Sequence, residues 1–310
     1  GIYFATHFHN WYHMAPLEDV VRYVEELALW GCNALSVWFD LSIYTGIDDP
    51  DAQAMIARLH AILAAAQRVG IRPSLTTLAN EGFKTTPEAL RATNKAQNGY
   101  FTAPYAYYGV EVCPSVPGGM ELILKNRTAV LDAFADIDLA YIWIWPYDAG
   151  GCTCAKCAPW GTNGFLKTAE AVAQRVRSRF PDARIVLSTW YFDLFVKGEW
   201  DGLRARFAAQ KPDWIDYLMI DHYGDFPKNP LEKGIPGGFP VLSFAEISMM
   251  GMNPWGGFGA NPRPRHWQAN KESNQHLLSG GFPYSEGIYE DINKVLQFQF
   301  GWDPDRDAEG

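Results

Sequence analysis

The sequence lacks any apolar run long enough to cross a membrane, and it is poor in basic residues. A membrane-spanning helix needs about 18 or more consecutive apolar residues, and no such run occurs among the 310 residues. There are 26 Lys and Arg against 35 Asp and Glu, which gives a net charge of −9. Nucleic acids and anionic membrane surfaces attract basic proteins. Neither is therefore an expected partner.

Motifs that would indicate an organic cofactor or an activated serine are also missing. The sequence has no G-x-S-x-G elbow, no P-loop and no dinucleotide fingerprint. We therefore expect no organic cofactor. No charged and apolar leader precedes the first strand-like segment, and we interpret residues 1–310 as a single catalytic domain taken from a longer protein. Cellular location and oligomeric state stay open.

What the sequence does have is a regular alternation of strand-like and helix-like segments. Eight apolar segments have strand character, and helical periodicity follows most of them. They are Gly1–His7, Cys32–Asp40, Ile71–Glu81, Tyr141–Asp148, Arg184–Asp193, Ile215–His222, Phe239–Glu246 and Phe282–Glu286. This alternation predicts one (β/α)8 TIM barrel, whose active site lies at the carboxyl ends of the strands.

The helix-like segments carry apolar residues at i, i+3 and i+4 spacing. Helices are predicted at Leu17–Trp30, Asp51–Val69, Glu121–Phe134, Phe165–Phe180, Glu199–Gln210, His266–Leu278 and Asp291–Phe300, with a turn or short helix at Pro227–Gly238. The longest connection, Asn80–Met120, follows the third strand. Such a length predicts an insertion with its own structure, such as a hairpin or lid over the barrel mouth.

Residues that can do chemistry stand at the ends of the strand-like segments. They are His7, Asp40, Glu81, Asp148, Asp193, Asp221, Glu246 and Glu286. Cleavage of a glycosidic bond uses two carboxyl groups, one as an acid and one as a nucleophile or base. We select Asp148, Glu246 and Glu286 as catalytic candidates. The structural alternative for Asp148 is that it caps the turn at Gly150 and Gly151.

Aromatic residues form 15% of the chain, and many of them lie in loop-like stretches near these acids. Sugar rings stack on aromatic faces while their hydroxyls bond to carboxylates and amides, although aromatic residues also fill cores. We predict an oligosaccharide or glycan as the partner, with Trp190, Trp255 and one of Tyr105, Tyr107 or Tyr108 stacking on it. The substrate-binding candidates are His7, His9, Asn10, Asp40, Glu81, Trp190, Asp221, His222, Trp255 and Tyr284.

Three cysteines follow the fourth strand in a C-x-C-x-x-C pattern, as Cys152, Cys154 and Cys157. Closely spaced thiolates predict a structural Zn²⁺ site, for which Cys113 is the best fourth ligand. A site with four thiolates leaves no open position for catalysis. Disulfides that involve Cys113, or free thiols, are the alternatives. The fifth cysteine, Cys32, is expected to be a buried apolar thiol.

His7 and His9 allow a second interpretation of the site. An H-x-H motif ending the first strand suggests a metal-dependent hydrolase of the amidohydrolase type. That class also needs histidines on the fifth and sixth strands and an Asp on the eighth. This chain offers only His222 on the sixth strand and Glu286 on the eighth. A non-catalytic sugar-binding barrel is a third possibility.

Several segments resemble a known group of glycoside hydrolases. Gly1-Ile2-Tyr3-Phe4 resembles the first strand of hexosaminidase-like and α-glucuronidase-like barrels. Cys113-Pro114-Ser115, Trp145-Pro146-Tyr147-Asp148 and the segment from Cys152 to Cys157 are similar to uncharacterised bacterial barrels of that group, which includes endo-β-N-acetylglucosaminidases. The resemblance implies a bacterial glycoside hydrolase with Asp148 at its site, in the cytoplasm, the periplasm or outside the cell.

The resemblance also suggests roles for the carboxylates. In many retaining barrels the acid comes from strand four and the nucleophile from strand seven. This implies Asp148 as general acid and Glu246 as nucleophile, with Glu286 as the alternative second carboxylate. The tandem acidic pair of substrate-assisted hexosaminidases is missing, because Ala149 follows Asp148. An acetamido-assisted mechanism is therefore not indicated.

Overall fold

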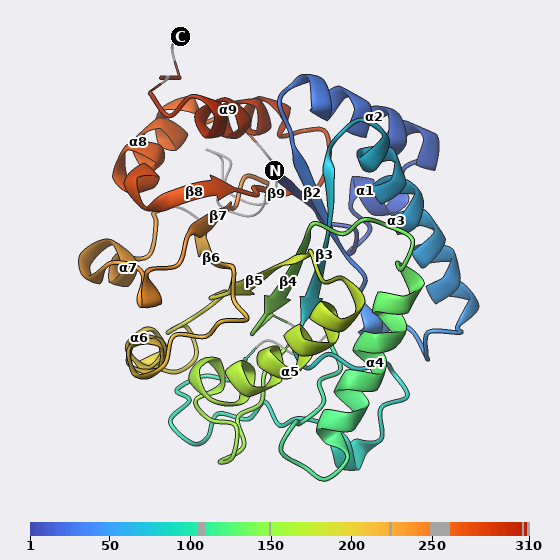
Figure 1. Cartoon of the computed structure of the whole chain (residues 1–310), viewed down its shortest axis with the longest axis vertical. Coiled ribbons are helices and arrows are strands. Elements are labelled where there is room, and N and C mark those ends of the chain that lie inside the picture. Colours follow the sequence, from blue (N-terminus) through green and yellow to red (C-terminus); the bar gives the residue numbers. More distant parts are fainter. Residues whose placement is uncertain (105–108, 149, 223–224, 249–260, 306, 309–310) are drawn as a thin grey trace. The chain divides into compact units, whose positions relative to one another are not determined.

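The computed structural model of this protein describes residues 1–104, 109–148, 150–222, 225–248, 261–305 and 307–308. Its strands follow the order β8-β7-β6-β5-β4-β3-β2-β1-β9 (Figure 1). The bounds are β1 Ile2–Phe4, β2 Ala34–Trp38, β3 Arg72–Leu78, β4 Tyr141–Trp145, β5 Arg184–Ser188, β6 Tyr217–His222, β7 Val241–Ala245, β8 Leu278–Gly281 and β9 Tyr284–Ser285. Parallel strands in chain order, separated by helices, are the arrangement of a TIM-like (β/α)8 fold.

The helices lie between these strands and match the predicted segments closely. Their bounds are α1 Trp11–Met14, α2 Leu17–Leu29, α3 Pro50–Arg68, α4 Gly119–Ala133, α5 Gly164–Arg179, α6 Glu199–Ala209, α7 Lys228–Lys233, α8 Pro264–Asn274 and α9 Asp291–Trp302. Short 3-10 helices cover Leu41–Ile43, Glu88–Leu90, Trp160–Thr162, Pro236–Gly238 and Gln275–Leu277. Among the described residues, no helix combines the length and the apolar character that a membrane crossing requires.

The chain forms two compact units. Unit 1 contains Gly1–Trp38, Arg58–Leu75 and Met219–Gly310, and unit 2 contains Phe39–Ala57 and Thr76–Leu218. Strands β3 and β6 contribute residues to both. Each unit is described by itself below.

In unit 1, the segment 278–285 forms the eighth strand position. Its first part, β8, pairs in parallel with β7, and its second part, β9, pairs in parallel with β1. Between them, the Phe282 N–H donates to the Ser243 carbonyl at 2.8 Å and the Tyr3 N–H donates to the Pro283 carbonyl at 3.1 Å. The segment therefore lies between β7 and β1, where the last strand of such a fold belongs. The predicted strand Phe282–Glu286 began four residues too late.

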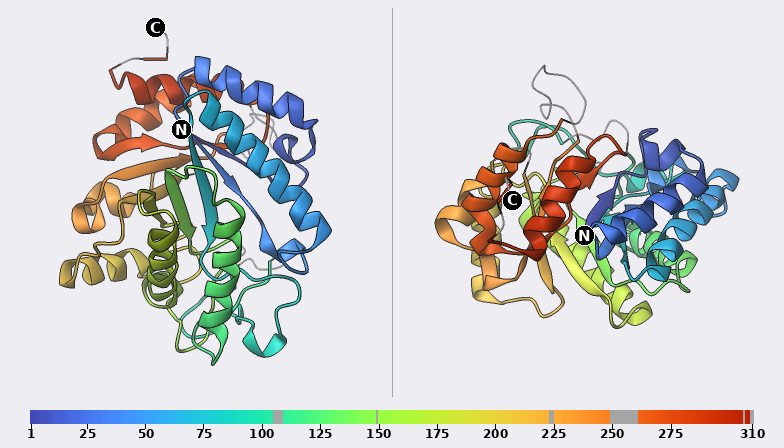
Figure 2. Two further views of the ribbon diagram at one scale, coloured as in Figure 1. Left: turned by 45° about the vertical axis from the view of Figure 1, so that its right-hand side comes forward. Right: turned by 90° about the horizontal axis from the view of Figure 1, so that it is seen from above.

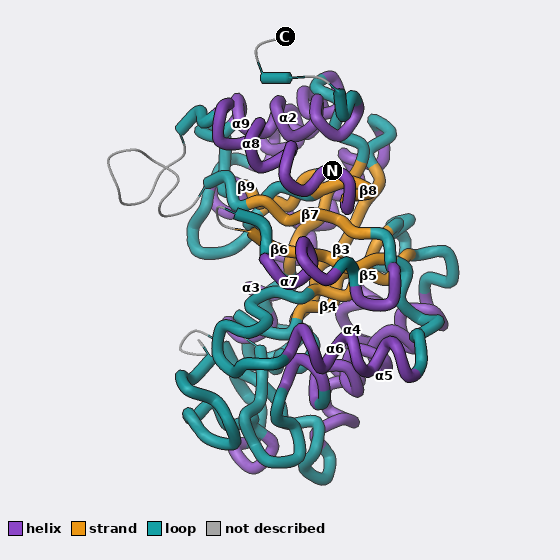
Figure 3. The backbone as a smooth tube through the Cα atoms, turned by 90° about the vertical axis from the view of Figure 1, so that its left-hand side faces the viewer, coloured by secondary structure: helices purple, strands orange, loops and turns teal. Residues whose placement is uncertain are grey.

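Aromatic rings fill unit 1 where these strands meet. Tyr3 of β1 stacks on Tyr284 of β9 with ring centroids 5.6 Å apart, and Phe244 of β7 contacts both rings edge-on. On the outside, α8 and α9 lie along β8, and α2 lies next to α9 (Figures 1 and 3). The strand ends that follow Phe244 and Tyr284 carry Glu246 and Glu286. The core therefore fixes the backbone from which both acids project.

In unit 2, β4 pairs in parallel with β5, and α4 packs beside α5 (Figure 2). All five residues of β4 are buried, as expected for a parallel strand that is covered on both faces. The connection from β3 to α4 runs over residues 79–118. Its described residues carry the 3-10 helix Glu88–Leu90 and the bridges Glu81–Glu111 and Arg91–Val112. Its role as a lid stays a prediction.

Candidate active site and cysteine cluster

Glu246 follows β7 directly and is almost fully buried, with 1% of its surface exposed. Its Oε1 accepts a hydrogen bond from the Ser248 N–H at 3.0 Å. Its backbone forms a parallel bridge with Tyr284. A buried carboxylate with a backbone donor is held in one orientation, as a nucleophile or base requires.

Glu286 follows β9 and is half-buried. The Tyr284 hydroxyl donates to its Oε1 at 3.0 Å. Burial raises the pKa of the Glu286 carboxyl and the nearby negative charge of Glu290 raises it too, while hydrogen bonds from Tyr284 and Asn10 lower it. A carboxyl with a raised pKa keeps its proton to higher pH, which is the property of a general acid.

Tyr284 lies next to both acids. Burial raises the pKa of its hydroxyl well above the ordinary value, and the negative charges of Glu286 and Glu246 raise it further. The hydroxyl therefore stays protonated and can donate throughout the physiological pH range. The structure thus brings together three predicted site residues, Tyr284, Glu246 and Glu286, at the ends of neighbouring strands.

The predicted residues after β1 have different environments. His7 is buried, and burial lowers the pKa of its ring to about 3, so that it is neutral at physiological pH. Its ring meets Trp38 edge-on at 4.8 Å. His9 is exposed and stacks on His13 instead, at 5.5 Å. The two rings contact different groups, so the structure does not favour them as a shared metal site. Asn10 precedes α1, and its side chain lowers the pKa of Glu286.

Asp221 and His222 end β6. Asp221 is half-buried, whereas His222 is buried against Phe226 and Trp267, with ring centroids 5.6 and 6.4 Å away. His222 and Trp267 also line a cavity of about 230 Å³ bordered by β8, α8 and α9. His222 therefore faces the helix layer of unit 1. A role for either residue in binding sugar stays a prediction.

In unit 2, Asp40 and Glu81 come together around a buried arginine. Glu81 is fully buried; its Oε1 accepts from the Leu41 N–H at 3.0 Å and its Oε2 pairs with Arg127 at 3.1 Å. Burial raises the pKa of Glu81 and Arg127 opposes this shift. Asp40 accepts from the backbone and side chain of Ser42, at 2.9 and 2.6 Å. These contacts suit a structural role for both acids within unit 2. Substrate binding by Asp40 or Glu81 stays a prediction.

Asp148 follows β4 and has a left-handed backbone with φ of 86°. It is half-buried and directly follows the buried Tyr147. Residues other than Gly seldom adopt positive φ, and when they do the surroundings impose it. The surroundings of Asp148 therefore hold its backbone in a conformation that is unusual for a residue other than glycine. Its catalytic role stays a prediction.

The aromatic residues predicted to stack on sugar are only partly described. Trp190 is buried and stacks on Trp145, with centroids 5.2 Å apart and planes at 26°. Trp255, Tyr105, Tyr107 and Tyr108 lie outside the described residues.

The packing of Trp190 leads to a stability prediction. Replacing Trp190 by Ala removes a buried indole beside Trp145, and such changes cost about 3–5 kcal/mol. We expect a free energy of unfolding lower by that amount in urea titrations. A protein of unchanged stability with a raised KM would instead favour sugar stacking by this residue.

Four cysteines converge in unit 2, as predicted. The sulfur atoms of Cys113, Cys152, Cys154 and Cys157 all lie within 4.8 Å of one another, and Cys113 is 3.9 Å from both Cys154 and Cys157. None of the five cysteines forms a disulfide in this structure, so the disulfide alternative finds no support. Cys32 is buried, as expected, and is not a member of this cluster. The four sulfurs form a possible metal site.

Asn80 joins the two loops that carry these cysteines. It is fully buried; its Nδ2 donates to the Val112 and Gly151 carbonyls at 3.0 and 2.9 Å, and its Oδ1 accepts from the Gly151 N–H at 3.0 Å. Val112 and Gly151 each precede a cysteine of the cluster. Gly151 has φ of 121°, a conformation suited to glycine. Asn80 thus fixes the spacing of Cys113 and Cys152.

Sequence reasoning missed a buried network around Glu199. This residue is fully buried, and its Oε1 accepts from the Tyr147 hydroxyl at 2.5 Å and from the Gly161 N–H at 2.7 Å. Tyr147 in turn lies 3.1 Å from the Tyr100 hydroxyl. The only sequence signal was an acid at a helix start, where capping is a sufficient explanation. The network holds the backbone next to Asp148.

Glu199 should make stability depend on pH. Burial raises the pKa of Glu199 from 4.5 to about 7. The folded state therefore binds the Glu199 proton more tightly than the unfolded state does. The contribution of Glu199 to the free energy of unfolding is full below pH 4.5 and is lost as pH rises through 7. The wild type should lose about 3 kcal/mol relative to Glu199→Gln across this range. Urea unfolding at several pH values tests this, with exposed Glu170→Gln as the control that should follow the wild type.

Known structures place this fold among glycoside hydrolases. No protein-family model and no curated protein sequence matches the chain. A GH20 β-N-acetylhexosaminidase from Streptomyces coelicolor aligns over 99% of this chain and 65% of its own, with 14% identity and a TM-score of 0.60. A β-hexosaminidase from Streptomyces plicatus, in complex with GlcNAc, aligns over 99% and 64%, with 14% identity and a TM-score of 0.59. An α-amylase from Geobacillus thermoleovorans aligns over 96% of this chain and 73% of its own, with 13% identity and a TM-score of 0.52.

These matches establish the fold. The chain has the barrel-like fold of GH20 hexosaminidases and of other glycoside hydrolases. It spans slightly less than two thirds of the two Streptomyces enzymes.

Proposed function

We propose that the protein is a glycoside hydrolase that cleaves a glycosidic bond with two carboxyl groups at the strand ends. The observation that supports this most directly is the grouping of Glu246 and Glu286 around Tyr284. The first is buried and held by the Ser248 N–H, and the pKa of the second is raised by burial. Different environments for two neighbouring carboxyls are what the acid and the nucleophile of a glycosidase need.

In this mechanism Glu286 gives its proton to the glycosidic oxygen as the bond from that oxygen to the anomeric carbon breaks. Glu246 attacks the anomeric carbon or takes a proton from an attacking water. In the first case, water then hydrolyses the ester while Glu286 takes back a proton. Asp148 is the alternative general acid, as the resemblance to retaining barrels implies.

The fold and the neutral His7 support a proposal for the substrate class. We propose a glycan, with aryl β-N-acetylglucosaminides as the first probes because several structures of similar fold are β-N-acetylhexosaminidases. The buried, neutral His7 ring, the half-buried Asn10 amide and the Tyr284 hydroxyl can bond to sugar hydroxyls without adding charge.

The cysteine cluster is proposed to bind a structural Zn²⁺. Four sulfurs around a tetrahedral zinc, each about 2.3 Å from the metal, are separated by about 3.8 Å. The observed 3.9 Å separations fit this geometry. When bound, zinc would supply a cross-link between the Cys113 loop and the loop after β4. It would leave no coordination position for substrate.

The test is a panel of aryl glycosides of different sugars and anomeric configurations. We expect release of the aryl group from at least one of them, with activity that survives chelation in a short assay. The configuration of the first-formed sugar, followed by NMR, would distinguish retention from inversion. Loss of activity on brief chelation that added metal restores at once would favour the metal-dependent alternative with His7 and His9. Binding without turnover would favour a sugar-binding barrel.

A further inference from the structure

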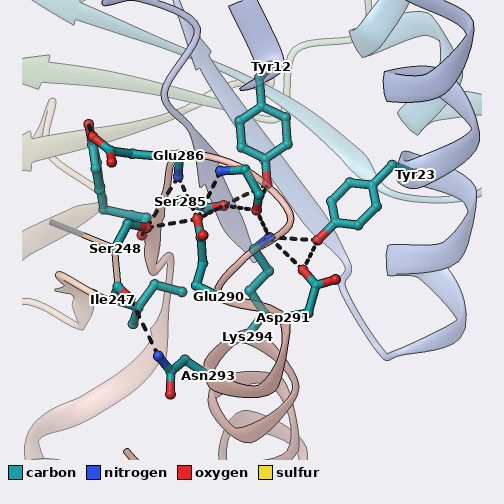
Figure 4. A network of polar contacts seen from close by, with 12 residues as sticks. Tyr12, Tyr23, Ile247, Ser248, Ser285, Glu286, Glu290, Asp291, Asn293 and Lys294 are labelled. Carbon is teal, nitrogen blue, oxygen red and sulfur yellow. Dashed lines mark hydrogen bonds and ion pairs between the residues drawn. The ribbon is translucent and has the colours of Figure 1, made fainter. Parts of the chain in front are cut away.

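Glu290 is a buried acid that the proposed mechanism does not use. It immediately precedes α9 and is 3% exposed. Its Oε1 lies within hydrogen-bond distance of four donors (Figure 4). They are the Ser248 and Ser285 hydroxyls at 2.8 and 2.7 Å, and the Glu286 and Gly287 N–H groups at 2.6 and 2.9 Å. A carboxylate with so many donors is an anchor for the surrounding backbone.

The contacts of Glu290 reach both proposed catalytic acids. It accepts directly from the backbone N–H of Glu286. It also accepts from the hydroxyl of Ser248, whose own N–H donates to the Glu246 carboxylate at 3.0 Å. The Ser248 hydroxyl contacts the Tyr284 carbonyl as well, at 3.1 Å. One buried carboxylate therefore connects the segment after β7 with the segment after β9.

The turn between Glu286 and Glu290 is fixed from its other side too. Lys294, with no exposed surface, donates to the Gly287 carbonyl, to the Tyr23 hydroxyl at 2.6 Å and to Asp291 at 2.9 Å. Gly287 has no room for a side chain, because a Cβ there would lie 2.7 Å from Cβ of Trp11. Figure 4 shows Glu290 and Lys294 projecting from the start of α9 into this turn. The Glu286 backbone is therefore held between α1, α2 and α9.

We propose that Glu290 is a positioning residue, which fixes Glu246 and Glu286 in the arrangement that the reaction requires. The inference rests on the proposed function, in which these two residues act. Catalytic groups must be held in a narrow range of geometry, and a misplacement of about 1 Å can cost about 100-fold in rate. Glu290 supplies that constraint through one backbone N–H and one serine hydroxyl.

The charge of Glu290 gives it a second effect on Glu286. Among the described residues of unit 1, the groups that act on the Glu286 carboxyl are the Tyr284 hydroxyl, the Glu290 carboxylate and the Asn10 side chain. Lys294 pairs with Asp291 at 2.9 Å, and the negative charge of Glu246 acts on Tyr284. The negative charge of Glu290 raises the pKa of Glu286. Removing it should lower that pKa, so that the proton donor is lost at a lower pH.

The experiment compares Glu290→Gln, which keeps the size and an acceptor oxygen but removes the charge, with Glu272→Gln on exposed α8 as the control. On a glycoside of the sugar that the wild type cleaves, with an alkyl or sugar leaving group that needs a proton to depart, we expect Glu290→Gln to lower kcat about 100-fold with KM changed less than about threefold. The alkaline limb of its kcat/KM profile should move to lower pH. Glu272→Gln should match the wild type. A purely structural Glu290 would lower stability but leave kcat per folded molecule and the pH limb unchanged, which would overturn the inference.

A second readout does not depend on activity. The carboxyl ¹³C signal of Glu286, assigned by its absence in Glu286→Gln, should titrate at a lower pH in Glu290→Gln than in the wild type. If the Glu286 signal of folded Glu290→Gln titrates with the same midpoint pH as in the wild type, the inference is overturned. If Glu286→Gln retains full activity, the catalytic assignment fails instead, while the ¹³C titration still decides whether Glu290 acts on Glu286.

Discussion

Replacing Glu246 by Gln should reduce kcat by about 10⁴–10⁶-fold, the range seen when an enzyme loses its nucleophile. The variant keeps the side-chain size and an oxygen that can accept from the Ser248 N–H at 3.0 Å, so the fold should survive. Circular dichroism and urea unfolding check this. If Glu246 forms a covalent intermediate, azide should restore turnover in the smaller Glu246→Ala and give a glycosyl azide. Near-normal activity of Glu246→Gln would show that the nucleophile lies elsewhere.

Glu286→Gln should behave differently, because a missing general acid matters most for poor leaving groups. General acid catalysis contributes about 10²–10⁴-fold. We expect such a loss with an alkyl or sugar leaving group and much less with an activated aryl group that departs without a proton. The alkaline limb of the pH profile should also disappear. These two signatures distinguish the acid from the nucleophile.

Asp148→Asn provides the matched comparison. If Asp148 is the general acid, as the resemblance implies, the leaving-group dependence will appear in Asp148→Asn and not in Glu286→Gln. If its positive φ only shapes the turn after β4, Asp148→Gly should preserve activity, because glycine adopts that backbone freely. The pair of substitutions therefore assigns one role to each residue.

Local patterns made most of the fold predictable. Seven helices were predicted with starts and ends close to the observed ones, because their apolar spacing and terminal residues are local signals. The last strand was harder. Residues Leu278–Gly281 include two glycines, which rarely favour a strand, and they form β8 because β7 offers a partner. At Leu278–Gly281, pairing with β7 therefore outweighed the weak strand preference of the local sequence.

The candidate site was predictable only where its chemistry lies close together in sequence. The cysteine cluster was found because three of its members fall within six residues. Glu199 and Glu290 were missed because their hydrogen-bond partners, such as Tyr147 and Ser248, are distant in sequence. Glu81 is a different case, because its predicted role in substrate binding stays a prediction. It stands at a strand end like a site residue, yet its contacts with Arg127 and the Leu41 backbone also suit a structural role.

Of the changes predicted for this protein, removal of metal from the cysteine cluster should lower stability the most. Purified protein should contain about one zinc per chain. Binding of a structural zinc can contribute about 10–16 kcal/mol to the folding of small zinc domains, so its loss should unfold at least the loop after β4. Slow chelation should lower the melting temperature, and added Zn²⁺ should restore it. Replacement by Co²⁺ should give the absorption of a tetrahedral thiolate complex.

Single substitutions make the same test specific. Cys154→Ser should lower zinc content, stability and activity together, because the loop that it anchors follows the segment with Tyr147 and Asp148. Cys32→Ser removes a buried thiol outside the cluster, so it should leave the zinc content unchanged. Hydrogen bonds within the cluster lower the pKa of Cys113 and raise the pKa of Cys152 and Cys157. Thiolates are the form that binds metal, so zinc binding should release protons from the cluster. A protein free of metal with wild-type stability in Cys154→Ser would show that the four sulfurs pack as thiols, and that the loop carrying Asp148 is held by the contacts of Asn80 and Glu199 alone.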